Sequence, residues 1–224
     1  MSMPNIAALT LQRQILSGTY KAGQMLPGQR DLAESLGISR ASLREALSML
    51  EALGFIRSVP GKGTLVTLGR SVSANNVVGA PSSGGIHATF QLRFVLEPAA
   101  AALAARAVNV HTAPRLWDTL ARFEAALKTL DLVSASNADL EFHQLIAELS
   151  GNALFLQVAH DFEGHISPSR LLPFADHSRI WEPEKEHHMI AAAISAGDAD
   201  GAKQAMQKHL LNAATRAGIE FVRP

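Results

Sequence analysis

The chain has 224 residues, enough for two domains of ordinary size that each bury a core. Hydrophobic residues make up 47% and charged residues 18%, as in globular proteins, and the formal net charge is zero. There is no cysteine, which excludes disulfides, thiolate metal sites and a cysteine nucleophile. No apolar run approaches the ~18 to 20 residues that span a bilayer, and the first residues are no signal peptide, so we expect a cytoplasmic protein with no membrane partner.

The zero net charge hides an asymmetry along the chain. Residues 1–68 contain seven Lys or Arg against four acidic residues, whereas the rest contains 13 against 16. All nine histidines lie in that second part. The basic first part is the one suited to a nucleic acid partner.

Three short helices are predicted in the basic part. The first carries apolar residues from Ile6 to Leu16 and closes at Gly18. The second has an apolar stripe and stops at Gly37, which tolerates the left-handed conformation. The third begins after Ser39 as N-cap. The inward positions of the second and third helices are Leu32, Ala33, Leu36, Leu43, Ala46, Leu47 and Leu50.

This layout is a helix-turn-helix, in which the start of the last helix enters the major groove. Arg40, Ser42 and Arg44 project from that start, where guanidinium groups pair with guanine edges and hydroxyls contact phosphates. Exposed arginines alone could simply be solvated. However, residues 55–56 and 64–67 are predicted to form two strands joined by the turn at 60–63, a hairpin called the wing. A helix-turn-helix followed by a wing favours DNA binding.

Residues 69–86 are rich in Gly, Ser and Asn, and we interpret them as a linker. The prediction is therefore a mainly α protein: a winged helix-turn-helix domain at 1–68, with a small β-wing, and an all-α helical bundle at 87–224. Helices of the bundle are expected at about 87–108, 113–131, 134–149, 153–168, 183–196 and 199–217.

Four residues of the bundle have the spacing of a metal site. Asp139 and His143 are four residues apart, so they share one face of a helix. His187 and His209 lie 11 residues before and after Asp198, the expected turn of a helical hairpin, which brings them level. Three imidazoles and a carboxylate suit a divalent cation such as Zn²⁺ or Ni²⁺. Any single one of these histidines could instead be a surface residue.

Two further details of the bundle bear on this site. His188 competes with its neighbour His187, but Ile190 and Ile194 place His187 on the apolar face. Arg93 and Glu97 are also four residues apart. They form either a surface ion pair or an inward-facing guanidinium that binds an anionic ligand, and the sequence leaves both open.

The chain resembles the GntR family of bacterial transcription regulators, and in particular its FadR branch with an FCD-type helical effector domain. The resemblance rests on the following segments: Ile15-Leu16-Ser17-Gly18, Arg30-Asp31-Leu32-Ala33, Leu36-Gly37-Ile38-Ser39-Arg40, Leu43-Arg44-Glu45-Ala46-Leu47, Gly61-Lys62-Gly63, Arg93 with Leu96-Glu97, Asp139 with Phe142-His143, Ser150-Gly151-Asn152, and Met206 with His209-Leu210. One departure is Pro27-Gly28-Gln29 before Arg30, where the family has Ser or Thr and then Glu.

The resemblance implies roles for individual residues. The residues implied at the DNA are Arg30, Ser39, Arg40, Ser42, Arg44, Gly61 and Lys62, the last two at the tip of the wing. The residues implied at a metal are Asp139, His143, His187 and His209. Those implied at the effector are Arg93 and Asn152.

These observations predict a metabolite-responsive transcription regulator, not an enzyme. We expect a homodimeric repressor that binds a pseudo-palindromic operator and holds a small carboxylate near the metal. Effector binding would move the DNA-binding domains through the 69–86 linker. The alternatives are a metal-sensing regulator and a helical metal-dependent hydrolase fused to a DNA-binding module. The hydrolase lacks a second inward carboxylate beside Asp139, since Glu141 points to another face.

Overall fold

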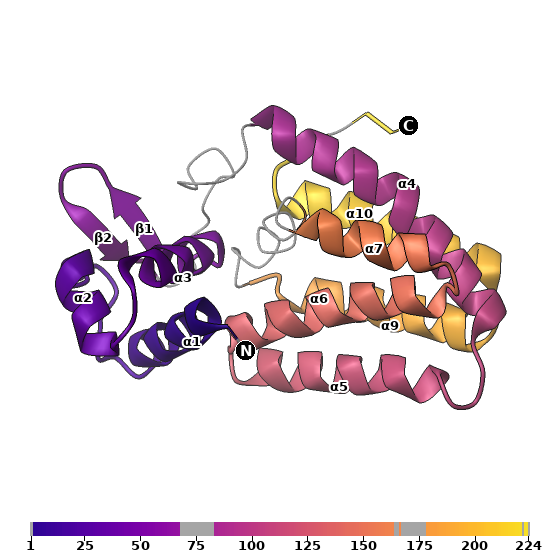
Figure 1. The fold of residues 1–224 in the computed structure, drawn as a ribbon, viewed down its shortest axis with the longest axis horizontal. Helices are drawn as coiled ribbons and strands as arrows, with labels where there is room; N and C mark the ends of the chain where they lie inside the picture. Colours follow the sequence, from indigo (N-terminus) through magenta and orange to yellow (C-terminus); the bar gives the residue numbers. More distant parts are fainter. Residues whose placement is uncertain (1, 68–82, 164–165, 167–177, 221, 224) are drawn as a thin grey trace.

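The computed structural model describes residues 2–67, 83–163, 166, 178–220 and 222–223. It consists of a small N-terminal part with a two-stranded sheet and a larger helical bundle (Figure 1). Among the described residues, no helix combines the length and apolar character needed to cross a bilayer.

The N-terminal part contains α1 (Met3–Leu16), α2 (Gln29–Leu36), α3 (Arg40–Ala52), β1 (Ile56–Val59) and β2 (Gly63–Val66). The strands are antiparallel, with Ile56 opposite Val66. Helix α2 ends at Gly37, whose φ of 65° is the left-handed conformation predicted there. The predicted winged helix-turn-helix is therefore confirmed.

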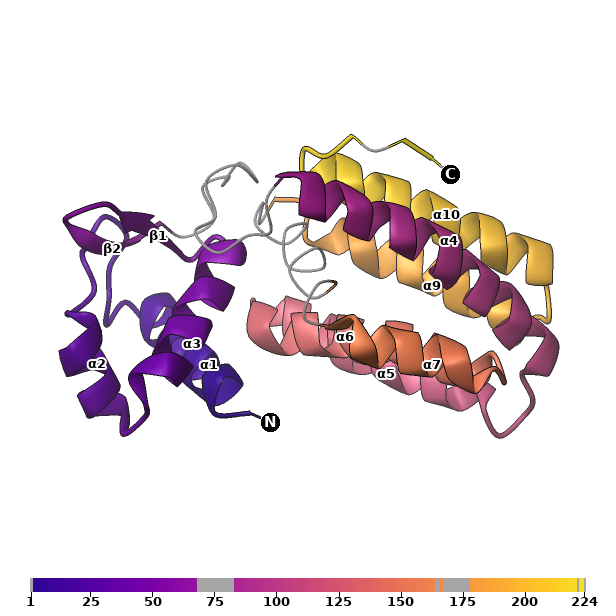
Figure 2. The same cartoon turned by 45° about the horizontal axis from the view of Figure 1, so that its top comes forward.

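The bundle contains α4 (Ser83–Ala107), α5 (Ala113–Lys128), α6 (Leu132–Leu149), α7 (Ala153–Asp161), α9 (Trp181–Ser195) and α10 (Ala199–Arg216). Figure 2 shows two layers, with α4, α9 and α10 on one side and α5, α6 and α7 on the other. The core between them consists of residues such as Ala101, Leu116, Phe142, Ile190 and Met206. The prediction of an all-α second part is confirmed.

Two boundaries differ from the sequence prediction. Helix α4 begins at Ser83, inside the predicted linker, whose residues 69–82 lie outside the described part of the chain. Glycine is a weak helix former, but Ile86 and Phe90 pack against the end of α10, and this packing outweighs the local propensity. Helix α7 ends at Asp161, before the predicted 168, and most of 164–177 is not described.

The two parts share an apolar core where α1 lies between α3 and the start of α6. Leu11 and Ile15 of α1 belong to the same buried cluster as Leu127 and Leu132 of the bundle. Gln12 is completely buried there; its Nε2 donates to Asp131 Oδ1 at 2.9 Å, and its Oε1 accepts from the Val133 N–H at 3.1 Å. The beginning of α6 is thus hydrogen-bonded directly to α1.

Candidate functional site

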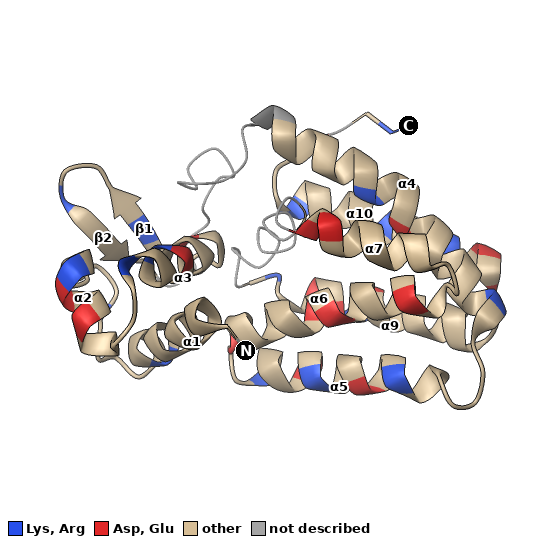
Figure 3. Cartoon of the chain, in the orientation of Figure 1, with Lys and Arg blue, Asp and Glu red and all other residues tan. Residues whose placement is uncertain are grey.

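The first candidate site is the exposed start of α3. Ser39 accepts a hydrogen bond from the Ser42 N–H at 3.0 Å, so it caps the helix as predicted. Leu43, Ala46 and Leu50 are buried, which turns Arg40 and Arg44 toward solvent. Lys and Arg side chains occur on α2, α3 and the wing (Figure 3).

The remaining residues predicted at the DNA lie on the surface of the same part. The Arg30 side chain is 85% exposed and contacts Asp31 at 3.4 Å. Gly61 and Lys62 are exposed at the tip of the wing, where Gly61 has a φ of 71°. All seven predicted residues thus belong to α2, α3 or the wing, and all but the half-buried Ser42 are exposed.

The position of the wing depends on a residue that the sequence did not single out. Glu51 of α3 is buried; its Oε1 accepts from the Ser58 N–H at 2.6 Å and its Oε2 accepts from the Ser58 hydroxyl at 2.9 Å. Two hydrogen bonds from one strand residue to one carboxylate hold β1 against α3. The sequence signal that could have identified it is its position four residues after Leu47, which places an acidic residue on the apolar face of the helix.

The second candidate site lies between the two layers of the bundle. Asp139 and His143 of α6, His187 of α9 and His209 of α10 are all at least 96% buried. One ring nitrogen from each of the three histidines lies within 4.8 Å of those of the other two. Asp139 Oδ1 is 3.4 Å from His187 Nε2 and 4.0 Å from His143 Nε2. The structure brings the three predicted histidines together and places Asp139 beside two of them, His187 and His143.

The helical hairpin of α9 and α10 explains this convergence. Gly197 has a φ of 72°, and Asp198 caps α10 by accepting from the Gly201 N–H at 2.9 Å. The rings of His187 and His209 consequently lie with their centroids 4.6 Å apart. His188 is instead half-exposed and contacts Glu184 at 3.1 Å. His187 is therefore the inward residue of the pair, as its apolar neighbours predicted.

The buried rings favour the neutral form that binds a metal. Burial lowers the pKa of His187 well below its ordinary value, and the neighbouring His209 and His143 lower it further. Burial also lowers the pKa of His209, although its hydrogen bond with Glu186 opposes this. Both imidazoles are neutral at pH 7, the form that ligates metals.

The hydrogen bonding of His187 provides the test of whether a metal fits. Neither of its ring nitrogens makes a hydrogen bond within the described residues, although the side chain is completely buried. Buried polar groups without a partner are rare in native proteins. A cation bound to a ring nitrogen of His187 would supply the interaction that this buried nitrogen lacks.

A carboxylate lies next to each of the other two imidazoles, and the one beside His209 is hydrogen-bonded to it. Glu97 Oε2 lies 2.9 Å from His143 Nδ1, and Glu186 Oε2 lies 2.8 Å from His209 Nδ1. Carboxylates in this position fix the tautomer of a metal-binding histidine and leave its Nε2 for the ion. The donor set of the described residues therefore fits a divalent cation.

Glu186 is itself held by a buried arginine. Arg216 Nη1 and Nη2 donate to its two carboxylate oxygens at 2.7 and 2.8 Å, and Asn212 donates at 2.8 Å. Burial alone would raise the pKa of Glu186, but the hydrogen bonds from Arg216 and His209 lower it to about 2. The sequence analysis did not predict this group.

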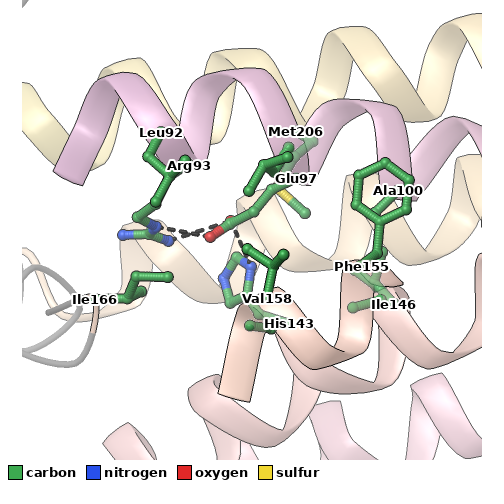
Figure 4. Close-up of a pocket in the computed structure, with 13 residues that line it drawn as sticks. Leu92, Arg93, Glu97, Ala100, His143, Ile146, Phe155, Val158, Ile166 and Met206 are labelled. Atoms are coloured by element: carbon green, nitrogen blue, oxygen red, sulfur yellow. Dashed lines mark hydrogen bonds and ion pairs between the residues drawn. The ribbon is translucent and has the colours of Figure 1, made fainter. Parts of the chain in front are cut away.

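A pocket that is partly open to solvent, with about 450 Å³ of empty space including that open part, adjoins the histidine cluster through His143. Figure 4 shows Arg93 and His143 on either side of the Glu97 carboxylate at one end of the cavity, with Phe155 at the other. The lining residues are Leu92, Arg93, Leu96, Glu97, Ala100, His143, Ile146, Ala147, Phe155, Val158, Ala159, Ile166 and Met206.

The two residues predicted at the effector lie in different places. Arg93 is 2% exposed, and its Nε donates to Glu97 Oε1 at 2.7 Å, so the pair is buried rather than solvated. Asn152 caps α7 by accepting from the Leu154 N–H at 3.0 Å and does not line the cavity. The structure thus associates only Arg93 with the cavity.

Glu141, which the hydrolase alternative would need as a second inward carboxylate, is exposed and paired with Arg122. This agrees with the face predicted for it. The expectation that no other carboxylate lies near the site is wrong, because Glu97 is 2.9 Å from His143 and Glu186 is 2.8 Å from His209.

Comparison with known proteins accounts for both parts of the chain. Residues 6–66 match the family model described as bacterial regulatory proteins, gntR family, and residues 88–212 match the FCD domain. The L-lactate dehydrogenase operon regulatory protein of Escherichia coli (strain K12) is 33% identical and covers 85% of this chain and 76% of its own length. The HTH-type transcriptional regulator LutR of Bacillus subtilis (strain 168) is 30% identical, covering 88% and 93%.

A solved structure of similar fold is Escherichia coli McbR/YncC, with a TM-score of 0.56 and 20% identity over 97% of this chain and 98% of its own. The family models and the two relatives identify a regulator of transcription and not an enzyme. The chain belongs to the GntR family of DNA-binding bacterial regulatory proteins and carries an FCD domain.

Proposed function

We propose that this chain is a metabolite-responsive repressor of the FadR branch, which acts in the cytoplasm as a homodimer on a pseudo-palindromic operator. Its effector is a small carboxylate that binds next to a divalent cation, Zn²⁺ or Ni²⁺. The two-fold symmetry of a dimer would be matched by the two half-sites of the operator.

The observation that carries the effector proposal is the buried imidazole of His187, which makes no hydrogen bond within the described residues and belongs to a cluster that adjoins a pocket containing Arg93. Asp139, His143, His187 and His209 would hold the cation, which would supply a positive charge for carboxylate oxygens. Arg93 would bind the other side of that carboxylate, as guanidinium groups do. One relative is named for an L-lactate dehydrogenase operon, and lactate is a small carboxylate.

The metal content of the purified protein tests the first step. We expect close to one equivalent of Zn²⁺ or Ni²⁺ per chain by mass spectrometry, and loss of most of it in His209→Ala. His188→Ala is the matched control, because this neighbouring histidine is half-exposed and lies outside the cluster. Equal metal content in both variants would contradict the proposed ligands.

A second experiment separates the proposed function from the metal-sensing alternative. In a footprint on the chain's own promoter, a carboxylate should change operator affinity by a coupling of about 1 to 3 kcal/mol in the metal-loaded protein. If the metal alone changes that affinity and no carboxylate adds to it, the chain is a metal sensor.

The DNA contacts are tested in the same assay. Arg44→Ala should weaken operator binding by ~1 to 3 kcal/mol if the guanidinium reads a base. Arg13→Ala removes the same charge from an exposed position of α1 and should have a small effect. Equal losses in the two variants would indicate a general effect of charge, and the assignment of α3 as the reading helix would be wrong.

A further inference from the structure

The cavity beside the histidine cluster is divided into a polar and an apolar end. Ten of its thirteen lining residues are apolar, and the other three are Arg93, Glu97 and His143. These three contact one another through Glu97, which bridges the guanidinium and the imidazole at 2.7 and 2.9 Å. Figure 4 shows them grouped on one side, away from Phe155 and Ile146.

From this division we infer that the effector is a monocarboxylate with a short apolar tail, and that the cavity selects against sugar acids and dicarboxylates. The inference rests on the proposed function, because it takes the carboxylate to bind between Arg93 and a metal next to His143. It adds the chemical class of the rest of the ligand.

The apolar end favours a hydrocarbon tail and disfavours hydroxyl groups. Phe155 of α7 and Ile146 of α6 offer no side-chain hydrogen-bonding group to a ligand. A tail placed against them gains the free energy of removing apolar surface from water. Each hydroxyl of a sugar acid would instead lose its hydrogen bonds to water without finding a side-chain partner among the described residues at that end.

Among the described residues that line the pocket, the polar end offers a single cationic side chain, Arg93, which suits one carboxylate. The guanidinium of Arg93 is already paired with Glu97, so the net charge that these two residues offer a ligand is close to zero. A second carboxylate on the ligand would meet the negative charge of Glu97 or the apolar wall, and both are unfavourable in a buried site.

Calorimetric titration of the full chain loaded with Zn²⁺ tests the inference, with acetate, butanoate and pentanoate as probes against gluconate and succinate. Affinity should rise by about fourfold for each added methylene, and pentanoate should bind at least tenfold more tightly than either gluconate or succinate.

Variants of α7 test where the apolar tail of the ligand binds. Phe155→Ala should weaken pentanoate binding about tenfold or more, whereas acetate, which does not reach that end, should change by no more than about twofold. Leu154→Ala is the matched control, since Leu154 is the preceding residue, is 66% exposed and does not line the cavity. Folding of each variant is verified by circular dichroism, and Phe155→Leu, which keeps an apolar side chain, should lose less than Phe155→Ala.

The possible results separate this inference from the function on which it rests. Tighter binding of gluconate or succinate than of pentanoate, or an equal effect of Phe155→Ala on acetate and pentanoate, overturns the apolar-tail assignment and leaves a carboxylate effector intact. Failure of all five probes to bind the Zn²⁺-loaded chain overturns the carboxylate effector itself.

Discussion

The carboxylate of Glu186 joins His209 to the buried guanidinium of Arg216, and its removal should destabilise the bundle. Glu186→Gln keeps the size of the side chain but removes the charge that faces Arg216, whose side chain is 1% exposed. The lowering of the Glu186 pKa from 4.5 to about 2 corresponds to roughly 3 kcal/mol of stabilisation. Breaking a buried ion pair by removing one partner typically costs ~3 to 5 kcal/mol, which agrees in order of magnitude.

The pH dependence of this effect has a defined sign. Because the folded-state pKa of Glu186 is depressed, its stabilisation is fully present above pH 4.5 and is lost as the pH falls toward 2. Thermal unfolding of metal-free protein at pH 7 should therefore show a Tm lower by about 5 to 12 °C in Glu186→Gln. The Tm values of the two proteins should converge as the pH approaches 2.

Glu182→Gln is the matched control for this experiment. Glu182 lies one helical turn earlier on α9, is 41% exposed, and contacts Arg216 at the longer distance of 3.4 Å. An exposed pair of this kind contributes at most about 1 kcal/mol. Equal Tm values for wild type and Glu186→Gln, or equal losses in the two variants, would refute the assignment of Glu186 as the residue that stabilises Arg216. Glu186→Gln should also weaken metal affinity by about 10- to 100-fold, because a neutral amide replaces the carboxylate that orients His209.

Other positions give further expected outcomes. Lys62→Ala at the wing tip should weaken binding to all DNA sequences alike and reduce the slope of log affinity against log salt by about 1, as measured by fluorescence anisotropy; an effect confined to one operator sequence would contradict a phosphate contact. His187→Ala should remove most of the metal and, in a thermal shift assay, abolish the rise in Tm that the metal gives the wild type; an undiminished rise would show that the cation binds elsewhere. Gln12→Leu leaves the buried Val133 N–H without its partner and should cost about 1 to 3 kcal/mol of unfolding free energy in urea titration. In a gel-shift assay, the same variant should reduce the effector response without changing effector-free operator affinity, and a loss of both equally would mean that the DNA-binding part itself is disturbed.

Much of the fold follows from local patterns in the sequence. The spacing of Leu43, Ala46, Leu47 and Leu50 determined the buried face of α3, and Gly37 and Ser39 marked the turn before it. The four-residue spacing of Asp139 and His143 placed both on one face of α6. The symmetric positions of His187 and His209 around Asp198 correctly predicted that an antiparallel hairpin brings them together.

The contacts that could not be predicted join residues far apart in the chain. Glu186 lies in the run Glu182-Pro183-Glu184-Lys185-Glu186, whose charges are typical of a solvated helix face, and only the distant Arg216 makes it a buried acid. Gln12 looks like an ordinary polar residue of α1 until Asp131 is placed beside it. The sequence also left open whether Arg93 points inward, because an i,i+4 pair forms equally well on a surface.

The burial of Gln12 and its apolar neighbours between α1 and α6 bears on how the protein unfolds. Leu11, Ile15, Leu127 and Leu132 are covered by residues from both sides of the segment 68–82. A fragment ending at residue 67 would expose the bundle-facing side of α1, and the bundle alone would expose the first turn of α6. Melting of either part would remove contacts from the other, and such shared contacts favour coupled unfolding. We therefore predict that the two parts unfold together in a single transition, with one Tm in calorimetry of the full chain.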